Sequence, residues 1–102
     1  MPLVLEPAAV RALYDEAVDR RWVLPCFCSE NLATTEAILA AAADHARETG
    51  IRDLPVTVAM TVNYDHRPQA RLYTQTRRWQ TGLGLFRRSL DVLLDPDGPF
   101  AD

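Results

Sequence analysis

WVLPCFCSENLATTEAILAAAA, residues 22–43, is the stretch that decides the fold. A short apolar segment gives way to small polar residues and Asn31, and a helical pattern follows at once. A strand, a polar corner and a helix in this order form the repeating unit of α/β folds, which carry functional side chains in such corners. We therefore expect an α/β protein organised around this corner.

The first unit has its strand over residues 22–28 and its helix over residues 32–49. The apolar segment is too short for a surface helix and is typical of a buried strand, although Pro25 lacks the N–H that a sheet ladder uses. Asn31 is a favoured N-cap residue and Gly50 a favoured C-cap residue, so both ends of the helix are marked.

A second unit follows. Residues 56–62, VTVAMTV, are rich in β-branched residues and predict another strand. Beyond a polar corner at 63–69, a long helix is expected over residues 71–94, with Gly82 and Gly84 each weakening it by roughly 1 kcal/mol relative to Ala. Its stripe of core-facing positions recurs every three or four residues: Leu72, Thr76, Trp79, Leu83, Phe86, Leu90 and Leu93.

Before both units, apolar spacing over residues 7–21 predicts a helix that starts at Pro7. The expected order is helix, strand, helix, strand, helix, within one domain over residues 1–102. The two strands are expected to be parallel, as in a βαβ unit.

Composition narrows the function classes. The net charge is −3, which disfavours nucleic acid as a partner because no general phosphate-neutralising field is present. All eleven basic residues are Arg, so these residues offer no Schiff-base lysine. No apolar run approaches the roughly 20 residues of a membrane span, and no signal peptide is evident, so a cytoplasmic protein is expected.

The only cysteines, Cys26 and Cys28, are two residues apart and point to one face of the first predicted strand. A disulfide between them would be strained, so reduced thiols are expected. The favoured interpretation is two small buried apolar side chains. The alternative is a pair of soft metal ligands, although no second pair or suitably spaced His accompanies them.

The sequence resembles the class II, zinc-dependent ketose-bisphosphate aldolases in their N-terminal portion. The matching residues are Val23-Leu24-Pro25-Cys26-Phe27-Cys28-Ser29-Glu30-Asn31-Leu32-Ala33, Ala37-Ile38-Leu39, and Pro55-Val56 with Thr61 at the end of that strand. Cys28 stands where the family usually has Asn, and nothing matches the family's His-Leu-Asp-His zinc motif.

The resemblance implies the N-terminal βαβα part of a (β/α)₈ TIM barrel with its active site at the carboxyl ends of the strands. It implies a lyase of carbohydrate metabolism and glycolysis that reversibly cleaves a ketose phosphate, with zinc in the complete enzyme but none bound by these residues. A sugar-phosphate substrate and a homo-oligomer are expected, and the chain alone is expected to be inactive.

Four residues are candidates for substrate binding, and none is assigned as catalytic or as a metal ligand. Asn31 can orient substrate or cap the helix, with the cap favoured. Thr61, at a strand end, can bond a phosphate or carbonyl oxygen. Asp65 and His66 form the most polar part of the second corner, and substrate contact is favoured there over acid–base catalysis. The competing hypothesis for the whole chain is a non-catalytic α/β module, or truncated product, that oligomerises or binds a partner.

Overall fold

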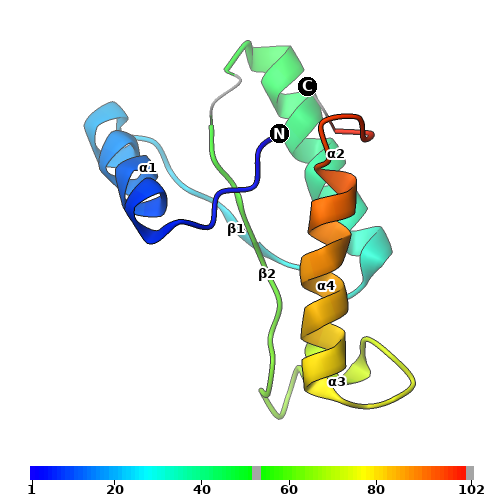
Figure 1. Ribbon diagram of the computed structural model, residues 1–102. Coiled ribbons are helices and arrows are strands. Elements are labelled where there is room, and N and C mark those ends of the chain that lie inside the picture. The colour runs from blue at the N-terminus through cyan, green and yellow to red at the C-terminus, as the bar shows by residue number, and fades with distance from the viewer. Residues whose placement is uncertain (52–53, 101–102) are drawn as a thin grey trace.

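The computed structural model describes residues 1–51 and 54–100 of the 102-residue chain. Its elements are, in order, α1 (Pro7–Arg20), β1 (Cys26–Cys28), α2 (Leu32–Thr49), β2 (Thr57–Ala59), α3 (Gln69–Leu72) and α4 (Trp79–Leu93). The strands β1 and β2 pair in parallel, which confirms the predicted α/β class with two parallel strands. In Figure 1, α2 and α4 lie beside each other on one side of the strands, while α1 stands apart on the other side.

The ends of α1 and α2 are set by residues next to them in the sequence. Pro7 occupies the first turn of α1, and Arg21 ends that helix in a left-handed conformation with φ 57°. In α2 the Asn31 side chain accepts a hydrogen bond from the Thr34 N–H, and Gly50 ends the helix at φ 75°. A left-handed residue at the helix C-terminus is the conformation that glycine adopts at no steric cost.

Both strands are shorter than predicted: residues 22–28 reduce to Cys26–Cys28, and residues 56–62 reduce to Thr57–Ala59. The first strand begins late because Pro25 has no N–H to donate to a neighbouring strand. Its carbonyl oxygen still accepts from the Thr57 N–H at 3.0 Å. The second strand ends early because β1 ends at Cys28, and within the described residues no other strand accompanies the chain after Ala59.

The two faces of the sheet are unequal. Val58 and Met60 pack against the hydrophobic core formed by Leu39, Phe86 and Leu90. Alternate residues of a strand point to opposite faces, so Cys26 and Cys28, with their partners Thr57 and Ala59, form the other face. We call these four residues the cysteine face. The prediction that the cysteines are buried is wrong, because both are exposed.

The single helix predicted over residues 71–94 is wrong: α3 and α4 are separated by residues 73–78. The hydroxyls of Thr74 and Thr76 form a hydrogen bond with an oxygen–oxygen distance of 2.6 Å, and the Arg78 N–H donates to the Thr76 hydroxyl. Such local side-chain bonds compete with helical ones. Arg77 then adopts φ 60°, which turns the chain back on itself.

Gly82 fixes how α3 meets α4. A Cβ atom built on Gly82 would lie 1.8 Å from the Ala70 carbonyl oxygen, so only glycine permits the two helices to approach this closely. The predicted stripe is therefore split. Its second half, from Leu83 to Leu93, packs in or against the core, whereas Leu72 and Trp79 are exposed.

Candidate functional site

The two predicted polar corners lie at the same edge of the sheet. Ser29 N–H donates to the Ala59 carbonyl oxygen at 2.7 Å, just beyond the paired residues Cys28 and Ala59. Because the strands are parallel, both chains leave the sheet at their carboxyl ends here. The residues that follow β1 reach Asn31, and those that follow β2 reach Thr61. This carboxyl edge is the candidate site.

A buried hydroxyl pair forms the floor of the first corner. The oxygens of Ser29 and Thr35 are 2.6 Å apart, and neither residue is exposed to solvent. Both hydroxyls also lie within hydrogen-bond distance of the Asn31 carbonyl oxygen, at 2.9 Å from Ser29 and 3.2 Å from Thr35. Ser29 thus connects the sheet edge to the start of α2. Thr35 was not identified from the sequence, although its position four residues after the N-cap places its side chain within reach of the Asn31 carbonyl oxygen.

Asn31 is the N-cap of α2, and its side chain is also available to a ligand. Its Oδ1 accepts from the Thr34 N–H at 2.8 Å and from the Thr34 hydroxyl at 2.9 Å. The residue is exposed, and no hydrogen bond among the described residues uses its Nδ2 group. The structure therefore confirms the cap, and it leaves the amide donors unused by the described residues.

Thr61 ties both ends of the second corner together. Its carbonyl oxygen accepts from Ala70 N–H at 3.0 Å, and its hydroxyl donates to the Arg67 carbonyl oxygen. Gln69 N–H approaches the same hydroxyl at 3.4 Å. The hydroxyl that was predicted to bond substrate is thus engaged in closing residues 62–69 into a loop.

Asp65 and His66 lie exposed on that loop. The His66 ring meets the Tyr64 ring edge-on, with centroids 5.5 Å apart and an interplanar angle of 68°. None of the hydrogen bonds or ion pairs found in the described parts of the chain joins Asp65 to His66, or either residue to Asn31. The loop therefore presents an aromatic ring, an imidazole and a carboxylate to solvent, without an acid–base pair.

Gln69 was not identified from the sequence. It is buried at the start of α3, and its Oε1 has no hydrogen-bond partner among the described residues. Buried amide oxygens normally accept a hydrogen bond, so a donor from outside the described residues would stabilise this position.

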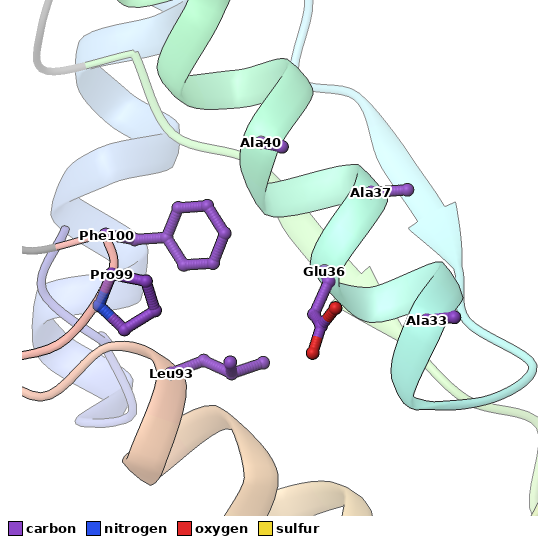
Figure 2. A pocket seen from close by; sticks show the side chains of 7 residues that line it. All are labelled: Ala33, Glu36, Ala37, Ala40, Leu93, Pro99 and Phe100. Atoms are coloured by element: carbon purple, nitrogen blue, oxygen red, sulfur yellow. The ribbon is translucent and has the colours of Figure 1, made fainter.

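A surface groove lies along α2. It is an open, mostly apolar groove of about 490 Å³ between α2 and the C-terminal turn. Figure 2 shows the Phe100 ring and Leu93 facing α2 across this groove, with the Glu36 carboxylate between the two sides. None of the four candidate residues lines it, so it is not part of the candidate site.

Within residues 1–51 and 54–100, no three His, Cys, Asp or Glu side chains are grouped to hold a metal ion. The ligand set that zinc requires in enzymes, three protein ligands and an open position, is therefore not met by these residues. The described helices also include none with the length and apolar character needed to cross a membrane.

Comparisons of this chain with protein-family models, with curated proteins and with solved structures found no match.

Proposed function

We propose that residues 1–102 form the N-terminal βαβα portion of a TIM barrel of the class II aldolase kind. The complete enzyme would reversibly cleave a ketose phosphate into two carbonyl fragments, and this portion alone would be inactive. The proposal rests on the resemblance carried by residues 23–39 and on one structural observation, the unequal faces of the sheet.

In a TIM barrel the helices form an outer ring and the inner strand faces pack against one another. Here α2 and α4 supply the core against Val58, while Cys26, Cys28 and Thr57 on the other face are exposed. Phe27, on the Val58 side of β1, is also exposed, so the contrast between the faces is carried by β2. Parallel sheets are normally covered on both faces. The cysteine face therefore corresponds to an inner wall that further strands would cover.

The candidate residues suit sugar-phosphate binding at the carboxyl edge. The Asn31 amide group can donate to a phosphate or carbonyl oxygen, and the loop residues Asp65 and His66 can meet sugar hydroxyls. Thr61 would position this loop rather than contact substrate. The described residues lack zinc's ligand set, so we assign them substrate binding and no metal-dependent step.

Complementation tests this proposal. The chain would be mixed with, and separately fused to, the remaining six βα units of a class II aldolase, and cleavage of a ketose bisphosphate would be measured with zinc present. We expect no cleavage from the chain alone and zinc-dependent cleavage from the fusion. Robust cleavage by the chain alone would contradict its assignment as a portion, and a folded but inactive fusion would contradict the aldolase assignment.

A second candidate function is favoured by the apolar residues that remain exposed. Val18 and Val23 are 76% and 85% exposed, and in the part of the chain that the structure describes each strand has one unpaired edge. A non-catalytic module would cover these features by forming a homo-oligomer. It would sediment as one defined species with a near-ultraviolet circular dichroism signal, whereas an isolated barrel portion would aggregate or show a molten spectrum.

A further inference from the structure

The cysteine face carries both thiols of the chain. Cys26 and Cys28 are exposed and free, and they are separated by one residue within β1. Strand residues two apart point the same way, so both sulfur atoms project from one face, with Cα atoms about 6.6 Å apart. These are the only two cysteines in the sequence.

This spacing disfavours a disulfide but suits a bridging ion. Parallel side chains keep the Cβ atoms near the Cα separation, whereas a disulfide needs them about 3.8 Å apart. A thiolate–metal bond is about 2.3 Å long for zinc, so an ion lying in line between two sulfurs separates them by about 4.6 Å. Rotation about the two Cα–Cβ bonds brings the sulfurs to that separation without moving the strand.

The number of donors selects the ion. The described residues group no third His, Cys, Asp or Glu with these thiols, and zinc prefers four ligands. Soft thiolates select Cu(I), which is stable with two thiolates in a linear arrangement. We propose that Cys26 and Cys28 form a two-coordinate site for a soft monovalent ion, Cu(I), on the exposed face of β1. The site needs the cysteine face to be open, so the inference concerns the chain as described and not a complete barrel, in which further strands would cover that face.

Binding is a ligand exchange without a redox step. Two S–H bonds break, two S–Cu bonds form, two protons pass to solvent, and copper remains Cu(I). Each Cu(I) ion that binds releases two protons. Lowering the pH by one unit should therefore weaken Cu(I) binding by up to about 100-fold.

The test is anaerobic titration of the reduced chain with Cu(I) in competition with a Cu(I)-specific chelator. We expect one ion per chain and two sulfur neighbours by X-ray absorption. Cys26→Ser and Cys28→Ser should each lower the affinity by more than about 100-fold, because losing even an outer-shell partner of a ligand costs 10–100-fold. Two ions per chain, or tighter binding of zinc than of Cu(I), would overturn the proposal.

Two matched variants test the geometry with the thiol count unchanged. Phe27→Cys with Cys28→Ala places the thiols on opposite faces, and it should bind as weakly as a single-thiol chain. Ala59→Cys with Cys26→Ala places the second thiol directly across from Cys28 on the same face, and it should retain the site. Far-ultraviolet circular dichroism confirms folding of each variant. Wild-type affinity in the opposite-face variant would refute the inference.

Discussion

At the scale of single residues, the hydroxyl pair of Ser29 and Thr35 connects the sheet to α2. The pair is buried, and its oxygens are 2.6 Å apart. A hydrogen bond between neutral groups contributes about 1 kcal/mol net, and an unsatisfied buried group costs about 1–3 kcal/mol. The corner is therefore sensitive to the loss of one hydroxyl.

We expect Thr35→Val to lower the free energy of unfolding by about 1–2 kcal/mol, because it keeps the side-chain shape and removes one partner of Ser29. Urea denaturation of this variant, of Ser29→Ala and of the double variant measures the coupling. The double variant should lose less free energy of unfolding than the two single variants lose when their losses are added. Strict additivity would show that the two hydroxyls do not interact.

Asn31 has a cap role and a candidate ligand role, and two substitutions separate them. Asn31→Ala should lower the free energy of unfolding by about 1 kcal/mol through loss of the cap. Asn31→Ser should keep the stability, because serine caps equally well, while removing the Nδ2 donors. If Asn31 contacts substrate, Asn31→Ser in the fused barrel raises KM without a change in the urea midpoint. An unchanged KM would leave Asn31 as a cap only.

Residue-level features were predictable where their cause is local. The Asn31 cap, the Gly50 terminus and Pro7 at the start of α1 each depend on neighbours within four residues, and all three are confirmed. The role of Thr61 depends on Arg67 and Ala70, six and nine residues away, so its residue type alone did not indicate that its hydroxyl is occupied.

At the scale of elements, the contact between α3 and α4 decides the shape of the second half of the chain. The apolar spacing from Leu72 to Leu93 is continuous in sequence and predicted one helix. The break at 73–78 depends on the approach of Gly82 to Ala70, a tertiary contact that periodicity does not contain. The strand lengths were not predictable for a similar reason. A strand extends only over the residues that pair with a neighbouring strand, and the sequence pattern does not show where that pairing stops.

The two glycines of α4 should respond oppositely to alanine. Gly82→Ala should destabilise the protein by about 1–3 kcal/mol, because its Cβ would collide with the Ala70 carbonyl. At Gly84 nothing lies within 4 Å of the added Cβ, so Gly84→Ala should stabilise the protein by about 1 kcal/mol through helix propensity. Thermal or urea unfolding of both variants measures the contrast. Equal effects of the two substitutions would contradict the close helix crossing.

At the scale of the whole molecule, the core is small. Among residues 1–51 and 54–100, the buried cluster consists of Leu39, Phe86 and Leu90, with partly buried residues around it. Small domains bury a lower share of their surface and have correspondingly low stability. The α/β class and the parallel pairing were predictable from the repeated strand-to-helix pattern, whereas the exposure of β1 was not, because it depends on what covers the second face.

We expect Leu39→Ala to cost about 2–5 kcal/mol, which is comparable to the stability available to a chain of this size. It should abolish the cooperative urea transition and the near-ultraviolet circular dichroism signal. Val92→Ala is the matched control, because Val92 is 69% exposed and its truncation should change the free energy of unfolding by less than about 0.5 kcal/mol. Retention of a wild-type midpoint by Leu39→Ala would show that the core lies elsewhere.

The hydrogen bonds of Thr61 have a consequence for motion. They hold Arg67 and Ala70 beside the end of β2, so the stretch between Thr61 and Arg67 is a short closed loop anchored at both ends. Tyr64, Asp65 and His66 all belong to this loop. A ligand that contacts one of these three side chains therefore meets the other two within the same short closed loop, so part of the conformational entropy of all three has already been lost on folding.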